Sequence, residues 1–442
     1  MTVGIRVATP AEWRTWRELR LRALTDSPDS FGETVEGTRE RDEAAWRSST
    51  SVDRTRVVLF AEHAGQPIGM AVGRISPDDP RRGHLYAMWV APEGRRLGAG
   101  RGLIDAVMRW ARLAGAATLF LRVTAQAPEA RALYRAMGFV ETGQVEALRP
   151  GSAIESFVMM AQLGPLVMGV VNTTPDSFSD GGRYLEPDTA IAHGLSLLRA
   201  GADLLDIGGE ATNPKAEPVD ATTELARIEP VIRALVAAGA TVSVDTTKAV
   251  VARAAVAAGA SIINDISGGL FDPDMSNVLA EFAGTYIAGH LRGRNLKEVF
   301  AAEGVVAARP IAARPISWRE VSAELGERLS SLPATIRGRT WIDPGVGFGK
   351  GADPEGNLSL LRHAGDLGRG LGCPIVVGPS RKRFLRRLVA RSLGCDPAEV
   401  TVEQLDVASV EASLGAVRAG AHVVRVHNVA LLRAALAVYT RM

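Results

Sequence analysis

Short apolar runs alternate with longer amphipathic segments in the second part of the chain. Eight runs of strand length occur, at 166–171, 203–207, 241–244, 261–263, 285–288, 340–342, 374–377 and 421–426. Most are followed by a stretch rich in Ala, Leu and Val with helical periodicity, such as 190–200 and 250–258. Eight strand–helix units in about 275 residues predict a TIM (β/α)8 barrel. A doubly wound open sheet is the alternative, but that fold usually has fewer strands.

Polar residues follow directly on these apolar runs. They are Asn172, Asp206, Asp245, Asn264, His290, Asp343, Ser380 and His427. In a barrel of this kind the carboxyl ends of all strands meet on one face, which is where active sites lie. The pattern therefore predicts one polar site on that face, built from residues that are far apart in the sequence.

The first part of the chain has a different pattern, typical of an α+β domain with a mainly antiparallel sheet. Two apolar runs flank the turn-like Ala64-Gly65-Gln66 and predict a hairpin. A strand at 85–90 and a helix at 103–113 follow. The two patterns meet at residues 162–165, so we expect domains at 1–162 and 163–442.

Composition narrows the class of protein. Hydrophobic residues make up 46% of the 442 residues and charged residues 23%, which is ordinary for a soluble globular protein. The net charge of +2 gives no field for nucleic acid or for an anionic membrane, so neither is expected as a partner. Two cysteines without C-x-x-C spacing, no signal sequence and no membrane-length apolar run indicate a cytoplasmic protein.

Seven motifs occur in order along the predicted barrel strands. They are Met168 to Gly182, Asp206 to Pro214, Ser243 to Thr246, Ile262 to Asp265, Trp341 to Lys350, Val377 to Lys382 and Val424 to Asn428. This ordered set resembles dihydropteroate synthase over residues 166–440. The resemblance implies condensation of 6-hydroxymethyl-7,8-dihydropterin pyrophosphate with p-aminobenzoate to give dihydropteroate.

The resemblance also implies the pterin-binding residues. Asp343 and Asn264 match the positions that face the guanidine-like edge of the pterin, and Asp245 matches the contact to the far ring nitrogens. Buried N–H donors of a ligand need such acceptors. Lys382 matches the donor to the pterin carbonyl, and Arg425 matches the residue that lies against the ring.

By the same matching, His427 and Asn172 correspond to pyrophosphate and Mg²⁺ ligands, with Asn172 on the metal. We expect Lys382, Arg425 and His427 to act in the chemical step, because departure of pyrophosphate needs cationic donors and a metal ion. The aromatic amine that attacks is neutral at pH 7, so no strong base is required. The p-aminobenzoate pocket implied by the resemblance contains Thr212, Pro214, Phe178, Phe348 and Ser380.

Some polar residues in these motifs depart from the family or are read as structural. Asn213 stands where the family commonly has Arg, which puts pyrophosphate affinity and sulfonamide sensitivity in question. Asp206, Glu210 and His290 are interpreted as supporting residues, and Asp265 equally as the cap of a turn.

A glycine-containing loop between a strand and a helix, within the run Met88–Arg101, marks the first domain. Free N–H groups at a helix N-terminus suit a pyrophosphate. Together with Leu119–Thr124 and Ala130–Phe139, this loop resembles the GNAT acetyltransferases over residues 3–162. The resemblance implies that acetyl-CoA is bound by Val90, Arg95, Arg96, Gly98, Ala99 and Gly100. It also implies that Tyr134 protonates the departing thiolate. The sequence does not identify the amine that accepts the acetyl group, and Glu33 and Glu36 are the candidate bases.

Two other functions compete with the first. The barrel could be a synthase-inactive paralogue that binds pterin while acetyl transfer is the working chemistry. A methyltetrahydrofolate-type methyltransferase barrel would share the pterin acids but has no need of the Ser380-Arg381-Lys382 run.

The resemblance further implies a homodimer formed through the barrel.

Overall fold

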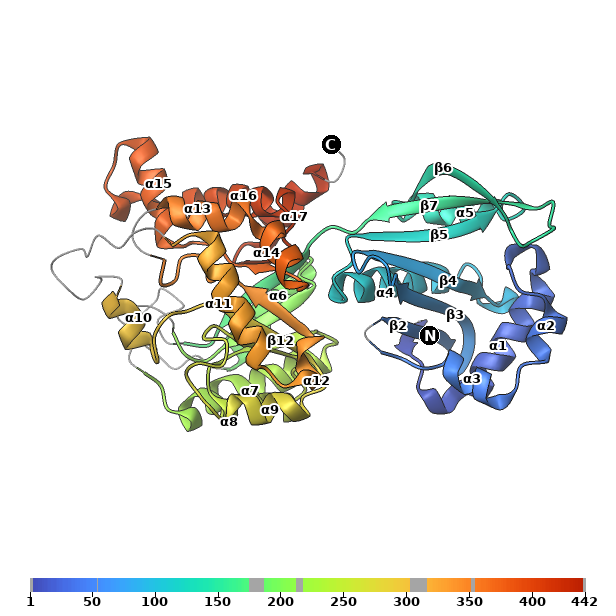
Figure 1. Ribbon diagram of the computed structural model, residues 1–442, viewed down its shortest axis with the longest axis horizontal. Helices are drawn as coiled ribbons and strands as arrows, with labels where there is room; N and C mark the ends of the chain where they lie inside the picture. The colour runs from blue at the N-terminus through green and yellow to red at the C-terminus, as the bar shows by residue number, and fades with distance from the viewer. Residues whose placement is uncertain are drawn as a thin grey trace. The chain divides into compact units, whose positions relative to one another are not determined.

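The structure is a computed structural model, and it describes residues 3–53, 55–174, 187–211, 218–302, 316–350 and 354–439. The chain forms two compact units, Met1–Gly164 and Pro165–Met442. Figure 1 shows both units, and each is described by itself.

The second unit contains an eight-stranded parallel barrel. Its strands are β8 (Leu166–Asn172), β9 (Leu204–Gly208), β10 (Val242–Asp245), β11 (Ile262–Asp265), β12 (Thr285–Gly289), β13 (Thr340–Asp343), β14 (Val376–Val377) and β15 (Val423–Val426). Neighbours run in the order β13-β12-β11-β10-β9-β8-β15-β14. A parallel bridge between Ile342 and Ile375 links the two ends of that order. The closed order confirms the predicted TIM barrel and excludes the open doubly wound sheet.

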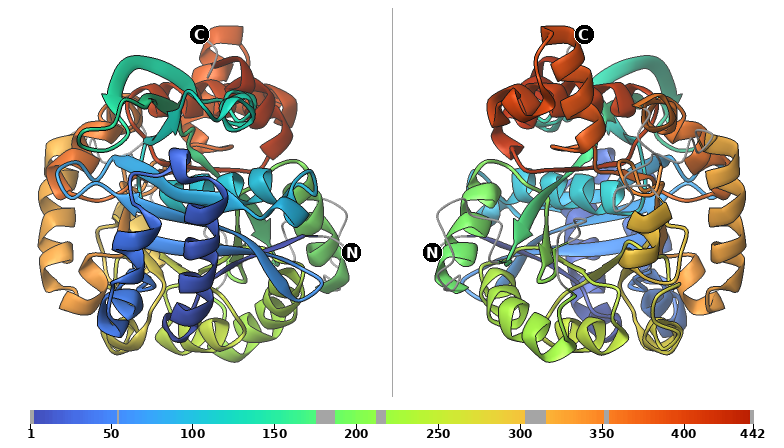
Figure 2. Two further views of the ribbon diagram at one scale, coloured as in Figure 1. Left: turned by 90° about the vertical axis from the view of Figure 1, so that its right-hand side faces the viewer. Right: turned by 90° about the vertical axis from the view of Figure 1, so that its left-hand side faces the viewer.

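Helices surround these strands (Figures 1 and 2). They are α6 (Pro187–Arg199), α7 (Ala221–Ala237), α8 (Ala249–Ala257), α9 (Met275–Glu281), α10 (Leu296–Ala302), α11 (Trp318–Ser331), α12 (Ala334–Arg337), α13 (Pro354–Arg362), α14 (Ala364–Leu371), α15 (Arg383–Leu393), α16 (Val402–Arg418) and α17 (Val429–Tyr439). Local sequence fixes several starts: Ser317 and Thr401 form capping boxes with Glu320 and Gln404. The apolar faces of the helices pack on the outward side chains of the strands in one continuous core.

The first unit is built on a seven-stranded sheet with the order β1-β2-β3-β4-β5-β7-β6. The strands are β1 (Gly4–Val7), β2 (Arg56–His63), β3 (Gln66–Ile75), β4 (Arg82–Val90), β5 (Thr118–Thr124), β6 (Val140–Ala147) and β7 (Glu155–Gln162). All pairs are antiparallel except β4 with β5. The predicted hairpin is present, and its turn has positive φ at Ala64 (51°) and Gly65 (75°). This mixed sheet confirms the predicted α+β domain.

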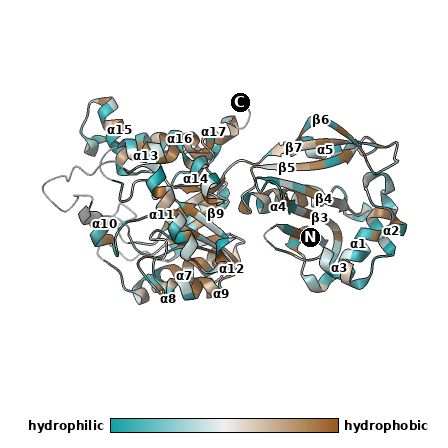
Figure 3. Cartoon of the chain, in the orientation of Figure 1, coloured by the Kyte–Doolittle hydropathy of each residue, from teal (hydrophilic) through white to brown (hydrophobic). Residues whose placement is uncertain are grey.

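Two groups of helices cover this sheet. On one face lie α4 (Ala99–Leu113) and α5 (Pro128–Ala136), and α4 includes the helix predicted at 103–113. A second core cluster contains α1 (Trp13–Asp26) and α3 (Glu43–Ser49), while α2 (Val35–Arg39) lies between them in the sequence. Most helices carry both hydrophobic and hydrophilic residues (Figure 3), as expected when one side packs and the other meets solvent. Within the described ranges, no helix has the length and apolar character needed to cross a bilayer.

Candidate functional site

The barrel site is organised around one buried carboxylate. Asp206 lies in the middle of β9 and is fully buried. Its Oδ2 atom accepts a hydrogen bond from Arg425 Nε at 2.5 Å and another from Asn264 Nδ2 at 3.0 Å. One carboxylate on β9 therefore fixes two predicted pterin-binding side chains, from β11 and β15.

The guanidinium of Arg425 also reaches a second strand end. Its Nη2 atom donates to Asp245 Oδ2 at 2.7 Å. Burial alone would lower the pKa of Arg425, but the carboxylates of Asp206 and Asp245 outweigh it and hold that pKa above its ordinary value. Burial raises the pKa of Asp245 to about 7, against the opposing effect of Arg425. Four polar groups from β9, β10, β11 and β15 thus form one connected network.

Lys382 and Asp343 lie within electrostatic reach of this network. Lys382 Nζ lies 4.2 Å from the centroid of the Phe348 ring, a cation–π contact. Burial, followed by the charge of Arg425, lowers the pKa of Lys382 to about 8, while Asp343 and Asp245 act in the opposite direction. Asp343 accepts from the Gly345 amide at 2.7 Å, and burial raises its pKa.

Close packing explains one glycine of this site. A Cβ atom on Gly347 would lie 2.8 Å from Lys382 Cγ and Cδ, and its φ is +80°. A larger residue at this position would push Lys382 out of place, so the glycine lets the β13 loop approach the lysine.

His427 and Ser380 face each other across two neighbouring strand ends. Ser380 Oγ and His427 Nδ1 are 2.9 Å apart, and the His427 amide donates to Ser380 Oγ at 3.2 Å. Burial, with the charges of Arg381, Arg425 and Lys382, lowers the pKa of His427 to about 3. The imidazole is therefore neutral at pH 7 and can donate or accept one hydrogen bond through its remaining nitrogen.

Asp406 on α16 was missed in the sequence analysis. Its carboxylate accepts from Arg381 Nε (2.7 Å) and Nη2 (3.0 Å) and from Asn428 Nδ2 (3.0 Å). It thereby joins the loop after β14 to the loop after β15, and it holds Arg381 at a φ of +57°. The signal that could have identified Asp406 is its position next to Leu405 on the buried face of a helix.

The polar residues read as supporting ones make local contacts. Asp265 accepts from the amides of Ser267 and Gly269, both at 2.8 Å, and so caps its turn. Glu210 accepts from Lys248 Nζ at 2.6 Å and from the Val219 amide at 3.1 Å. These contacts brace the loops around the rim.

The buried histidine on the β12 side also has a bracing partner. Nε2 of His290 lies 3.0 Å from Glu324 Oε2. Burial lowers the pKa of His290, so the ring is neutral. It therefore supports the loop that carries it.

Part of the predicted p-aminobenzoate pocket falls outside the described residues, namely Phe178, Thr212 and Pro214, as does Asn213. Asn172 ends β8, is half-buried and pairs in register with Gly208. In the described ranges no three His, Cys, Asp or Glu residues gather as a metal cluster. Mg²⁺ commonly binds through one or two protein oxygens plus phosphate and water. A site at Asn172 that relies on substrate oxygens fits this pattern.

The predicted acetyl-CoA loop follows β4 in the first unit. Gly98 caps α4 with a φ of +88°, and Ala99 and Gly100 form its first turn. Arg95 donates through Nε to the carbonyl of Val90 at 3.2 Å, while exposed Arg96 takes a φ of +66°. The free amides at the start of α4 make this turn suitable for a phosphate group.

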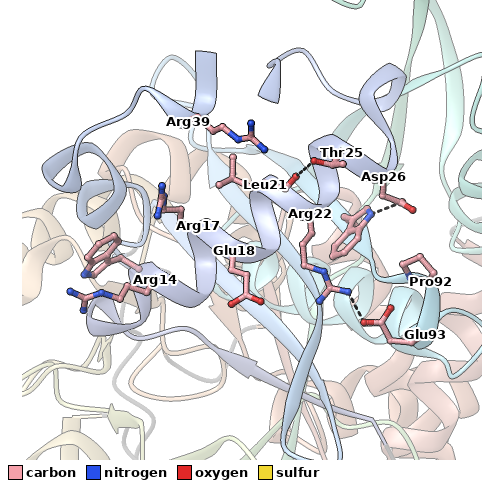
Figure 4. Close-up of a pocket in the computed structure, with 12 residues that line it drawn as sticks. Arg14, Arg17, Glu18, Leu21, Arg22, Thr25, Asp26, Arg39, Pro92 and Glu93 are labelled. Atoms are coloured by element: carbon pink, nitrogen blue, oxygen red, sulfur yellow. Dashed lines mark hydrogen bonds and ion pairs between the residues drawn. The ribbon is translucent and has the colours of Figure 1, made fainter. Parts of the chain in front are cut away.

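Contacts with α1 hold this loop (Figure 4). A hollow of about 750 Å³ lies between α1 and the end of β4. At its border, Arg22 Nη2 donates to Glu93 Oε1 at 2.6 Å and Trp89 Nε1 donates to Asp26 Oδ2 at 3.0 Å. Arg95 also pairs with Asp26. The strand end and the middle of the loop are thus tied to one helix.

Two residues proposed for acetyl transfer have contrasting surroundings. Tyr134 on α5 is 7% exposed, packs edge-on against Phe139, and burial raises its pKa, which keeps the phenol protonated. Glu33 is held by Arg20 at 2.9 Å and by Arg41 at 2.7 Å. Burial raises the pKa of Glu33, but these cations outweigh it and lower that pKa overall. Glu33 is therefore a poor base, whereas Glu36 has no such contact among those described.

Comparisons with known proteins agree with this architecture. The family described as pterin binding enzyme matches residues 168–427. The dihydropteroate synthase of Mycobacterium leprae is 42% identical over 269 residues, which covers 60% of this chain and 88% of that protein. The chain belongs to the dihydropteroate synthase family. The dihydropteroate synthase of a Synechocystis species is 38% identical, over 60% of this chain and 85% of its own length.

Solved structures of dihydropteroate synthases are also similar. The enzyme of Xanthomonas albilineans with 4-aminobenzoic acid is 40% identical with a TM-score of 0.52, covering 63% of this chain and 93% of that one. The Yersinia pestis enzyme in a sulfonamide complex is 32% identical with a TM-score of 0.54, covering 63% and 94%. The first unit matches the acetyltransferase (GNAT) family over residues 13–139. The chain is therefore a transferase enzyme in which a GNAT domain precedes a dihydropteroate synthase barrel.

Proposed function

We propose that the barrel condenses 6-hydroxymethyl-7,8-dihydropterin pyrophosphate with p-aminobenzoate to give 7,8-dihydropteroate and pyrophosphate. The observation that carries this proposal is the network of Asp206, Asp245, Asn264 and Arg425 at one rim. These groups supply acceptors and a flat cation, which suit a planar heterocycle rich in N–H donors. Dihydropteroate synthases at 40% identity or above, together with their solved structures, support the assignment.

Pterin recognition follows from hydrogen-bonding capacity. Asn264 and Asp343 would face the amino and ring N–H donors, Asp245 the far ring nitrogens, and Lys382 the ring carbonyl. Each is wholly or partly buried, so an unmatched ligand would leave polar groups unsatisfied. Arg425 already pairs with two carboxylates, Asp206 and Asp245, and would contact the pterin ring face.

The chemical step requires departure of pyrophosphate from the pterin methylene. The C–O bond breaks, the amine nitrogen of p-aminobenzoate bonds to that carbon, and the amine loses a proton to solvent. Arg425 and Lys382 would stabilise the negative charge that develops, and neutral His427 would hydrogen-bond the leaving group. Mg²⁺, when bound by Asn172 and the pyrophosphate, would neutralise charge on that group.

The p-aminobenzoate ring would lie near Phe348, with Ser380 as a donor to its carboxylate. Ser380 is 5% exposed and precedes α15, where helix N–H groups also favour an anion. Phe178, Thr212 and Pro214 complete this pocket in the proposal.

Retention of the charged network argues against an inactive pterin-binding paralogue. Burial of charged groups costs free energy, so a barrel that no longer needs them would be expected to lose them first. Neither a binding-only barrel nor a methyltransferase barrel would form dihydropteroate. Incubation of the full chain with Mg²⁺, the pterin pyrophosphate and p-aminobenzoate tests the proposal, since release of pyrophosphate without dihydropteroate would contradict it.

For the first unit we propose transfer of an acetyl group from acetyl-CoA to an amine. The loop of Val90, Arg95, Arg96, Gly98, Ala99 and Gly100 would hold the pyrophosphate of acetyl-CoA. Protonated Tyr134 would supply the proton to the thiolate. Calorimetric binding of acetyl-CoA to the full chain tests this part, and absence of binding would contradict it. The cytoplasmic location and the homodimer remain predictions.

A further inference from the structure

The strands β4 and β5 separate directly after the pair His84–Phe120. They pair in parallel only at Arg82–Thr118, Gly83–Leu119 and His84–Phe120. Beyond Phe120, the remaining residues of β5 pair with β7, up to Thr124. The two strands lie side by side in Figure 1. The sheet therefore opens next to His84.

Side chains alternate across β4 on the two faces of the sheet. A Cβ atom on Gly83 would lie 3.4 Å from Ala111 of α4, and Leu85 belongs to the core that includes α4. His84 and Tyr86 therefore project from the opposite face, because successive residues of a strand point to opposite sides. Tyr134, the proposed acid, packs in the core on the α4 face.

Three rings form a row on that opposite face. The rings of His84 and Tyr86 are stacked with centroids 5.6 Å apart and planes 17° apart. The His84 and Phe120 centroids are 5.8 Å apart, and the Arg82 guanidinium lies 4.3 Å from the centroid of Phe120. Tyr86 ends the row and is 48% exposed. The row offers a planar, accessible surface beside the opening in the sheet.

The imidazole of His84 is available for proton transfer. It is half-buried, and no hydrogen bond joins it to another residue in the part of the chain described. Burial and then the charges of Arg82 and Arg74 lower its pKa, so the ring is neutral at pH 7. Arg74 is the cross-strand partner of His84 on β3. Two cations, Arg74 and Arg82, therefore lie beside His84, whose other neighbours, Tyr86 and Phe120, are uncharged.

We propose that the acceptor of this domain is a planar aromatic amine that carries a negative charge, bound against Tyr86 and His84, and that His84 takes the proton of the attacking amine. The inference rests on the proposed acetyl transfer. The rings favour a flat acceptor through stacking. Arg74 and Arg82 repel an alkylammonium ion and attract a carboxylate or other anion. A neutral aromatic amine needs no prior deprotonation, so a weak base such as imidazole suffices.

The transfer step balances as follows. The amine nitrogen bonds to the thioester carbonyl carbon, and the C–S bond breaks. The nitrogen loses one proton to an imidazole nitrogen of His84, and the thiolate gains one from Tyr134. The products are an N-aryl acetamide and free CoA, and proton exchange with solvent restores both side chains.

Matched amines test the acceptor class. The full chain is assayed with acetyl-CoA in the absence of pterin pyrophosphate, so that the barrel lacks a co-substrate. The probes are 4-aminobenzoate, 4-(aminomethyl)benzoate with an alkylammonium on the same ring, and uncharged aniline. We expect kcat/KM for 4-aminobenzoate to exceed both others by at least about tenfold, with the acetamide identified by mass spectrometry.

Two results would overturn the inference in distinguishable ways. If acetyl-CoA binds and either 4-(aminomethyl)benzoate or aniline is the preferred acceptor, the acceptor class is wrong and acetyl transfer stands. If acetyl-CoA does not bind, the proposed acetyl transfer is itself wrong and the inference fails with it.

Variants test His84 separately. We expect His84→Gln to lower kcat by about 100-fold while leaving the KM for acetyl-CoA unchanged. Added imidazole should restore activity to His84→Ala, an effect that a purely structural role would not give. His63→Gln, which changes a half-buried histidine on β2 away from the opening, is the matched control and should keep wild-type rates. A wild-type kcat in His84→Gln overturns the assignment of the base.

Discussion

Asp206 and Arg425 are 219 positions apart in the sequence, yet Asp206 Oδ2 accepts a hydrogen bond from Arg425 Nε at 2.5 Å inside the barrel. The same oxygen accepts from Asn264, and Arg425 continues to Asp245. Asp206 thus holds Arg425 and Asn264, two of the side chains proposed to bind the pterin. Several consequences can be measured.

Substitution of Asp206 by Asn should weaken both stability and pterin binding. The change removes one of two charges that compensate a largely buried guanidinium. Loss of one partner of a buried ion pair commonly costs about 3 kcal/mol in the free energy of unfolding. Urea unfolding and the KM for the pterin pyrophosphate are the measurements. Unchanged values in both would show that Asp206 does not hold Arg425.

Pterin binding should depend on the ionisation of Asp245. Its pKa is raised to about 7, so the acceptor carboxylate is lost as the pH falls through that value. We expect the association constant of the pterin pyrophosphate to fall by about tenfold from pH 8 to pH 6. Asp245→Asn should bind more weakly and lose this dependence, and it also controls for titration of the ligand. A wild-type profile that matches the variant would contradict the assignment.

Lys382 should set the alkaline limb of the pH profile for dihydropteroate formation. Burial lowers the pKa of this lysine to about 8, so its positive charge is lost as the pH rises through that value. The rate of dihydropteroate formation should therefore decline above pH 8. Lys382→Arg keeps the charge at high pH. If the wild type and this variant decline in parallel, another group is responsible.

Asp406→Ala should loosen two loops of the barrel. Three hydrogen bonds to Arg381 and Asn428 would be lost, and we expect the free energy of unfolding to fall by about 2 kcal/mol. Asp366→Ala is the control, because the exposed Asp366–Arg369 pair contributes under about 0.5 kcal/mol. Equal losses in the two variants would mean that Asp406 has no special role.

Tyr134→Phe should slow acetyl transfer without unfolding the domain. The ring is buried against Phe139, and phenylalanine preserves that packing while removing the proposed proton donor. We expect kcat to fall by about 100-fold with an unchanged dissociation constant for acetyl-CoA. Retention of the wild-type kcat would leave Tyr134 as a core residue only.

The sequence predicted the barrel because its strands are buried on both sides and therefore read as apolar runs. The run at 241–244 corresponds to Val242–Asp245, and the polar residue that ends it belongs to the candidate site. The run at 374–377 was longer than β14, since Ile375 makes only an isolated bridge and the strand is confined to Val376–Val377. Strand boundaries thus shift by one or two residues where polar ends or bridges intervene.

Side-chain partners were harder to predict than positions. Asp206 was read as structural, but nothing in an apolar strand shows that its carboxylate meets Arg425. Asp406 lies on a helix outside every motif, so only the folded chain reveals its contact with Arg381. The ring row of the first unit depends on the point at which β4 and β5 separate, which hydrophobic periodicity does not record.

Formation of 7,8-dihydropteroate by the full chain tests the central claim most directly. The assay contains Mg²⁺, 6-hydroxymethyl-7,8-dihydropterin pyrophosphate and p-aminobenzoate, with product and pyrophosphate quantified together. We predict equimolar dihydropteroate and pyrophosphate from the wild type, and a loss of at least about 100-fold in Arg425→Ala. Tight binding of the pterin pyrophosphate by the wild type with no dihydropteroate formed would contradict the account.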